Sequence, residues 1–181
     1  MSDPTIQSPL RMADTIRPDL LPAGFTDPVA AYRTGIYAWP DNQIRRFSRM
    51  VGISTTGRAA SARLARFADV EHYDATPAQA PAFLDARAEA GHHDGGIYCS
   101  RFTLPYLFEQ LGPRRPRLWI ATLDNIYWTP VALCANIADS WHLEIDPAWI
   151  WAIQCFPADP AIGISWDTSL VYGEHDFWDP R

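Results

Sequence analysis

Short apolar runs recur along the chain, and segments rich in proline, glycine or polar residues separate them. A short apolar run bounded by turn residues is typical of a β-strand that is buried on both faces. We therefore expect strands at 10–14, 35–39, 50–54, 66–71, 95–100, 117–122 and 149–156, and one more within 162–172.

The clearest helical signal lies over 77–90. Thr76 provides a helix cap, Pro77 suits the first turn, and apolar residues then recur at helical spacing. Gly91 follows as a terminator. The segment therefore predicts a helix directly after the strand at 66–71.

The other connections carry weaker signals. A helix is expected over 103–111, where a Gly-Pro pair stops it, and short helical turns over 28–32 and 41–47. The segment 55–65 predicts a loop or a turn of helix. The segment 124–147 breaks the pattern and is expected to be a long, irregular, aromatic excursion.

About eight strands joined by short helical connections predict an α/β protein, specifically a modified TIM-like (β/α) barrel with few helices. We expect a single domain spanning 1–181, with an insertion at about 124–147. An open parallel sheet is the competing hypothesis. No Gly-x-Gly-x-x-Gly or P-loop motif is present to support nucleotide binding in such a sheet.

Charge and cysteine content narrow the function classes. The net charge of −6 argues against a general nucleic-acid-binding surface. The three cysteines show no Cys-x-x-Cys spacing, so buried free thiols are expected. The first residues show no secretory signal, and no run approaches the roughly 20 apolar residues of a membrane span.

Two carboxylates end the expected strand at 66–71. Asp69 and Glu71 are two residues apart, so on a strand they point to the same side, with Cα atoms about 6–7 Å apart. Such a pair is either a set of surface acids at a loop entrance or a site in which the acids are used. The carboxyl ends of strands are where α/β proteins keep their chemistry, and the residues alone leave both hypotheses open.

Several motifs, taken in order, resemble glycoside hydrolase family 25, in particular the compact lysozyme-like proteins of actinobacteria and their phages. The match runs from about residue 10 to residue 176 and is most specific at the Asp-x-Glu segment. The motifs are Met12-Ala13-Asp14, Asp69-Val70-Glu71, Ile97-Tyr98-Cys99-Ser100, Trp119-Ile120-Ala121, Trp151-Ala152-Ile153-Gln154 and Trp166-Asp167-Thr168-Ser169.

This resemblance implies a barrel of eight strands that cleaves the muramic acid–glucosamine linkage of peptidoglycan. It implies that Glu71 is the general acid and Asp69 its partner carboxylate, with Asp14 and Asp167 as supporting acids of the cleft. One protonated and one ionised carboxyl are also what glycoside cleavage requires chemically. The side chains expected to contact the sugar are Tyr98, Trp119, Gln154 and Trp39.

The sequence departs from the family in the loop after the sixth strand and after the seventh-strand glutamine. Thr122-Leu123 and Cys155 stand where polar or aromatic residues usually help to form the sugar platform. A second hypothesis is therefore a catalytically silent barrel that serves as a structural or glycan-binding component of a phage particle, with other virion proteins as partners. The segment 124–147 would then provide a docking surface. With no secretory signal, we expect synthesis in the host cytoplasm, with later association with a virion or release to the cell wall.

No cofactor or metal ion is expected. The run His92-His93-Asp94 invites a metal hypothesis, but it follows the helix terminator Gly91, where a solvated turn is expected. A basic turn formed by the arginines at 114, 115 and 117 is either a solvated loop or a contact for an anionic polymer or neighbouring subunit.

Overall fold

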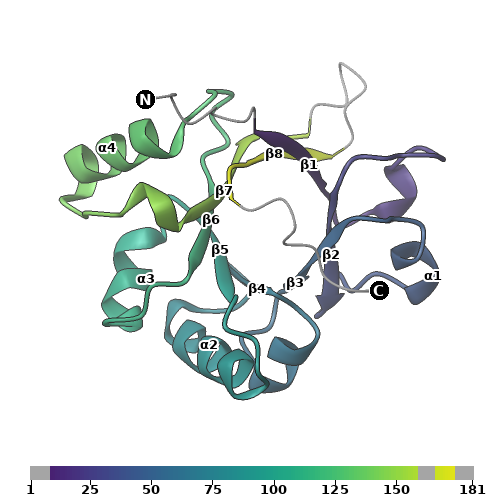
Figure 1. Ribbon diagram of the computed structural model, residues 1–181, viewed down its shortest axis with the longest axis horizontal. Helices are drawn as coiled ribbons and strands as arrows, with labels where there is room; N and C mark the ends of the chain where they lie inside the picture. Colours follow the sequence, from purple (N-terminus) through teal and green to yellow (C-terminus); the bar gives the residue numbers. More distant parts are fainter. Residues whose placement is uncertain (1–8, 159–165, 174–181) are drawn as a thin grey trace, which may run out of the picture.

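The computed structural model describes residues 9–158 and 166–173, and these form a closed barrel of eight strands in chain order (Figure 1). Strands β1 to β7 pair in parallel, whereas β8 runs antiparallel to both β7 and β1. The barrel confirms the predicted fold class. The strands are β1 (Leu10–Asp14), β2 (Val29–Thr34), β3 (Met50–Ser54), β4 (Phe67–Val70), β5 (Gly96–Ser100), β6 (Arg117–Ala121), β7 (Ile150–Phe156) and β8 (Asp167–Val171).

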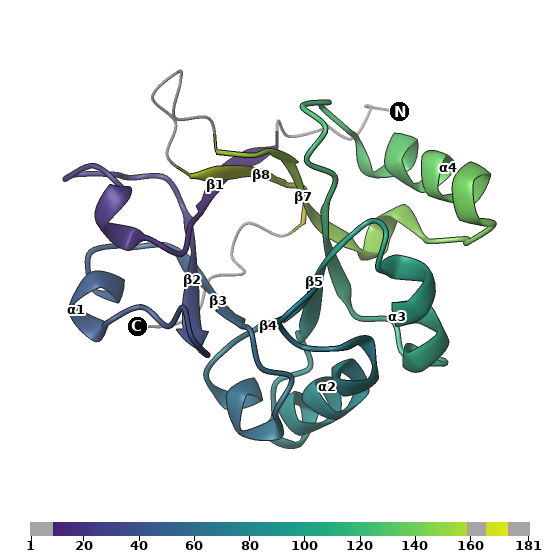
Figure 2. The ribbon, with the colours of Figure 1, turned by 180° about the vertical axis from the view of Figure 1, so that it is seen from behind.

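Helices cover the outside of the barrel unevenly. The three longer helices, α2 (Ala80–Glu89), α3 (Leu104–Leu111) and α4 (Pro130–Trp141), lie outside β4 to β7, and the view from behind shows the same arrangement (Figures 1 and 2). The short α1 (Asp41–Ile44) lies beside β2 and β3. Within the described ranges, no helix combines the length and the apolar character that crossing a bilayer requires.

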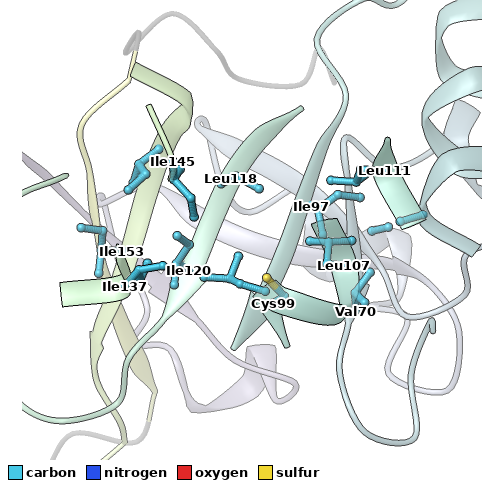
Figure 3. Close-up of a cluster of buried hydrophobic side chains, with 14 of the residues drawn as sticks. Val70, Ile97, Cys99, Leu107, Leu111, Leu118, Ile120, Ile137, Ile145 and Ile153 are labelled. Carbon is cyan, nitrogen blue, oxygen red and sulfur yellow. The ribbon is translucent and has the colours of Figure 1, made fainter. Parts of the chain in front are cut away.

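Outward-facing side chains of β4 to β8 pack against these helices in one apolar cluster (Figure 3). Strand residues such as Val70, Ile97 and Ile120 meet Leu107 of α3 and Ile137 of α4 there. All five side chains are fully buried. Burial of this kind contributes roughly 1.5–3 kcal/mol per large apolar side chain, which holds the helices on the strands.

The barrel interior is filled by aromatic rings. Phe67 of β4 lies with its ring centroid 5.8 Å from that of Trp119 and 4.9 Å from that of Trp151. Trp119 donates a hydrogen bond from Nε1 to Ser169 Oγ of β8 at 2.9 Å. Because side chains alternate along a strand, the inward Phe67 places Asp69 on the inner side of the barrel too.

Gly96 is required by this packing. A Cβ atom at position 96 would lie 2.2 Å from Cε1 of Phe67. We expect Gly96→Ala to lower the free energy of unfolding by about 1–3 kcal/mol, because the buried Phe67 ring has no room to move. Chemical denaturation measures this loss. Gly95→Ala is the milder control, since its Cβ would lie 3.1 Å from Cδ2 of Leu84 and 3.2 Å from Cδ of Arg87, contacts that shifts of a few tenths of an ångström relieve. An equal loss in both variants would contradict the packing argument.

The second strand was wrongly placed by its sequence pattern. The structure has β2 at Val29–Thr34, where a helical turn was expected over 28–32, and a turn at 35–39, where a strand was expected. The run Val29-Ala30-Ala31-Tyr32 is buried on both faces, so it lacks the alternation that distinguishes a strand from a helix. Gly35, with φ of +92°, then turns the chain out of the sheet.

The segment 124–147 is not irregular, because it contains α4. The sequence does contain features that indicate the start of this helix. Thr129 caps it by accepting a hydrogen bond from the N–H of Ala132, and Pro130 occupies the first turn. Leu133 and Ile137 are spaced four apart on the buried face. The helix ends at His142 in a left-handed conformation, so the usual glycine terminator is missing.

The remaining predicted elements agree more closely with the structure. The helix expected over 77–90 begins with a 3-10 turn at Pro77–Gln79 before α2, and the segment 55–65 contains a 3-10 turn at Ala59–Arg63. The N–H of Thr76 donates to Oε1 of Gln79 at 2.8 Å. The strand expected within 162–172 is β8, and positions 162–165 lie outside the described residues.

Candidate active site

The four acids singled out in the sequence meet at one end of the barrel. Asp14 is the last residue of β1, Asp69 lies in β4, and Glu71 follows that strand directly. Asp167 is the first residue of β8, and because β8 runs antiparallel, this end lies beside the carboxyl end of β1. Asp14 and Asp167 are direct partners in the β1–β8 pairing. Residues far apart in sequence therefore share one site.

A cleft of about 360 Å³ opens at this end of the barrel. Its volume lies at the lower end of the range for small-molecule sites, so it has room for a short portion of a polymer. Three of the four acids line it directly, together with tyrosine, glutamine and apolar side chains. The lining includes Asp14, Ile16, Arg17, Leu20, Tyr32, Glu71, Tyr98, Leu123, Gln154, Trp166 and Asp167.

Glu71 has the properties of a proton donor at neutral pH. Partial burial, followed by the nearby charges of Asp74 and Asp167, raises the pKa of Glu71 to about 7. A carboxyl with such a pKa is protonated in about half of the molecules at pH 7. It is therefore suited to give a proton to a leaving group.

Asp14 and Asp69 are more deeply buried, with side chains 3% and 2% exposed. Burial is the main reason why the pKa of each is raised well above its ordinary value, and the charges of neighbouring acids add to it. Asp69 accepts one long hydrogen bond from the Tyr32 hydroxyl at 3.4 Å. Among the described residues, Oδ1 of Asp14 and Oδ1 of Asp69 have no hydrogen-bond partner. Both groups therefore favour the neutral form.

Asp167 is held differently. Gln154 donates from Nε2 to Asp167 Oδ2 at 2.7 Å, and the N–H of Ala158 donates to Oδ1. Burial raises the pKa of Asp167, and these two hydrogen bonds oppose the rise because they stabilise the carboxylate. Asp167 is therefore the acid of this cleft whose contacts best support a negative charge.

Two of the four expected sugar contacts line the cleft and two do not. Tyr98 and Gln154 line it. Trp119 is fully buried among the interior rings, and Trp39 is 5% exposed, with its Nε1 donating to the carbonyl of Thr15 at 3.1 Å. Neither tryptophan presents a surface to the cleft. Closure of the barrel places Trp119 in the interior, and the turn at 35–39 packs Trp39 against Phe47.

Several cleft residues could not be recognised from the sequence. Tyr32 was not predicted to line the cleft, because its strand was predicted as a helical turn. Ile16 and Leu20 lie in the loop after β1, and Leu123 lies in the loop after β6. Loops that follow parallel strands line the site end of a barrel, so the position of Asp14 at a strand end could have indicated the first two.

The other candidate groups lie away from the cleft. Among the described residues, no group of three or more His, Cys, Asp or Glu side chains is arranged to hold a metal ion. Asp94 is bound by Arg66 and Arg87, with N–O distances of 2.9 Å in both pairs. Arg114 pairs with Asp85 at 2.8 Å. The three cysteines are free and buried, as their spacing predicts.

The closed barrel, with acids around a cleft at one end, has the architecture of the modified (β/α) barrels. Comparison of whole structures narrows this class. The chain is similar to a glycosyl hydrolase 25 of Streptococcus pneumoniae, described as a virulence factor participating in host cell invasion, with a TM-score of 0.52 and 13% identity over 92% of this chain and 87% of that one.

A bacterial lysozyme from Streptomyces coelicolor gives a TM-score of 0.49 at 12% identity, covering 94% of this chain and 95% of that one. No protein-family model matches the sequence, and a search of curated proteins found no match. The similarity to the Streptococcus pneumoniae protein shows that this chain has the barrel fold of a glycosyl hydrolase 25, as its sequence motifs predict.

Proposed function

We propose that this protein is a glycoside hydrolase that cleaves peptidoglycan, with Glu71 as the general acid. The observation that carries the proposal is the position of Glu71, a carboxyl with a pKa of about 7, at a cleft that Asp14 and Asp167 also line. The fold supports the reaction class, and the motif-level resemblance supports peptidoglycan as the substrate.

Glycoside cleavage needs a proton on the leaving oxygen and a negative charge near the sugar carbon that becomes positive. Glu71 supplies the proton to the glycosidic oxygen as the bond from that oxygen to the sugar carbon breaks. Water then adds to the sugar carbon, and its proton restores Glu71. Asp167, with its two donated hydrogen bonds, is the better candidate for the ionised partner, whereas the single long hydrogen bond of Asp69 favours a supporting role.

The test is hydrolysis of purified actinobacterial cell walls by the wild-type protein, followed by turbidity and by release of reducing ends. Reducing the new ends with borohydride before acid hydrolysis identifies the bond. A muramic acid alcohol would support the proposed linkage, and a glucosamine alcohol would contradict it.

An alternative is that the barrel binds glycans without cleaving them, as a structural component of a phage particle. The burial of Trp39 and Trp119, which leaves the cleft without two expected stacking rings, favours this alternative. A folded wild-type protein that binds wall fragments but releases no reducing ends between pH 4 and 8 would support it.

The pH profile provides an independent check on Glu71. Only the protonated form donates, so kcat/KM is expected to fall about tenfold for each pH unit above pH 7. Initial rates between pH 5 and 9 measure this, with circular dichroism at each pH to show that the protein stays folded. A rate that keeps rising to pH 9 would exclude Glu71 as the general acid.

A further inference from the structure

Leu123 occupies an unusual position in the cleft. Its side chain lines the cleft and is 46% exposed, and its backbone φ is +52°. This left-handed region disfavours a residue with a bulky side chain, since Cβ approaches the following carbonyl oxygen. Strained residues of this kind persist only where the surrounding structure holds them, and they concentrate at functional sites.

The surroundings of Leu123 hold it from two directions. Its own N–H donates to the carbonyl of Gln154 at 3.2 Å, and the N–H of Thr122 donates to the same oxygen at 2.9 Å. The next residue, Asp124, pairs with Arg101 at 3.0 Å and accepts from Nε1 of Trp128 at 3.0 Å. The backbone of Leu123 is therefore held between β7 and the paired Asp124, so its Cβ keeps a defined position at the cleft.

The chemistry of the cleft indicates what this side chain meets. Leu123 shares the cleft with two other exposed aliphatic side chains, Ile16 and Leu20, which are 47% and 42% exposed. Arg17, the one cationic side chain among the described residues that line the cleft, is paired with Asp19 at 2.7 Å. The site thus combines uncompensated acids with small aliphatic surfaces.

A flat sugar face stacks best on an aromatic ring, whereas a branched aliphatic side chain suits a methyl group. An ionised Asp167, which has no cationic partner among the described residues, would also attract the free amine of an unmodified amino sugar. The N-acetylated sugar is neutral and lacks this attraction, but it carries a methyl group that the free-amine sugar does not have. A contact between Leu123 and that methyl group would favour the N-acetylated sugar and so offset the attraction. Leu123 is therefore suited to discriminate between the two forms.

We propose that Leu123 is a specificity residue that contacts the acetamido methyl group of an N-acetylated amino sugar and favours that sugar over its free-amine form. The inference rests on the proposed function, since it concerns the substrate of the same cleft. It adds a selectivity that the acids by themselves do not provide.

Leu123→Gly tests the contact without endangering the fold. Glycine adopts positive φ without steric cost, so the variant loses the side chain and keeps the backbone. Its thermal midpoint is expected to stay close to that of the wild type. Asn125→Gly is the matched control, because Asn125 also has a positive φ, of +59°, and is exposed, but it does not line the cleft.

The measurement compares kcat/KM on purified wall glycan with that on the same glycan after chemical removal of its acetyl groups. Leu123→Gly is expected to lose about fivefold on the acetylated glycan and little on the free-amine form, as burial of a methyl group predicts. Asn125→Gly is expected to match the wild type on both. An unchanged preference in Leu123→Gly would overturn the inference while the proposed function stands.

If the wild type cleaves neither glycan, the proposed function fails and binding decides the inference separately. Calorimetric titration with oligomers of N-acetylglucosamine and of glucosamine would then measure the two affinities. Tighter binding of the acetylated oligomer that falls in Leu123→Gly would uphold the role of Leu123. Equal loss for both oligomers, or no loss, would reject it.

Discussion

Glu71→Gln is expected to lower kcat on cell-wall glycan by about 10²–10⁴-fold, the range that positioned proton donors contribute. Glutamine keeps the shape of the side chain and cannot donate the proton that the carboxyl holds at a pKa of about 7. Because the proton moves only in the transition state, KM is expected to change much less than kcat. Initial rates of reducing-end release over a range of glycan concentrations measure both parameters.

Glu89→Gln is the matched control for this variant. Glu89 is exposed at the end of α2, so the same chemical change is made outside the cleft. Its activity is expected to equal that of the wild type. Residual activity of Glu71→Gln above about one tenth of the wild type would mean that another group donates the proton, and Asp14, Asp69 and Asp167 would be the next variants to measure.

The same Glu71→Gln variant is expected to be more stable than the wild type at pH 8, by about 2–3 kcal/mol at most. The pKa of Glu71 is raised from 4.5 to about 7 in the folded protein, so the folded state binds its proton more tightly than the unfolded state does. The associated stability is fully present below pH 4.5 and is lost as the pH rises through 7. Glutamine carries no charge at any pH, so the variant escapes this loss.

Urea unfolding at pH 4.5 and at pH 8 measures the difference. The gain from Glu71→Gln is expected at pH 8 and is expected to be close to zero at pH 4.5. Glu89→Gln, as an exposed substitution, is expected to stay within about 0.5 kcal/mol of the wild type at both pH values. A gain of equal size at both pH values would show that packing, and not the charge of Glu71, is responsible.

A gain in stability together with a loss of activity would show that the cleft holds its acids at a cost to folding. Asp14 and Asp69 are buried beside Glu71 without cationic partners among the described residues, which is an arrangement that packing alone would not favour. The ring cluster of Phe67, Trp119 and Trp151 lies in the same barrel and offsets this cost through apolar burial.

Most strands could be predicted because each is a short apolar run with a clear end. Met50–Ser54 and Arg117–Ala121 are examples, and both are buried almost throughout. The prediction failed at Val29–Thr34, where alanines with helical preference form a strand because neighbours on both sides supply hydrogen-bond partners. It also failed at α4, whose end depends on a left-handed His142.

In the candidate site too, some residues could be grouped from the sequence and others could not. Asp69 and Glu71 could be paired from sequence, because their spacing on one strand is a local property. The approach of Asp14 and Asp167 to them could be expected only through resemblance to a family. In the structure it results from the antiparallel pairing of β8 with β1, a contact between the two ends of the chain.

The succession of apolar runs in the sequence was thus enough to indicate a barrel of buried strands with acids at the strand ends. The elevated pKa of Glu71, the burial of Trp39 and Trp119, and the strained Leu123 in the cleft were decided by the closed barrel alone. The physical reason is that the burial of a side chain, and the charges that shift its pKa, depend on residues that are distant in sequence. Those neighbours are brought together only when β1 and β8 close the sheet.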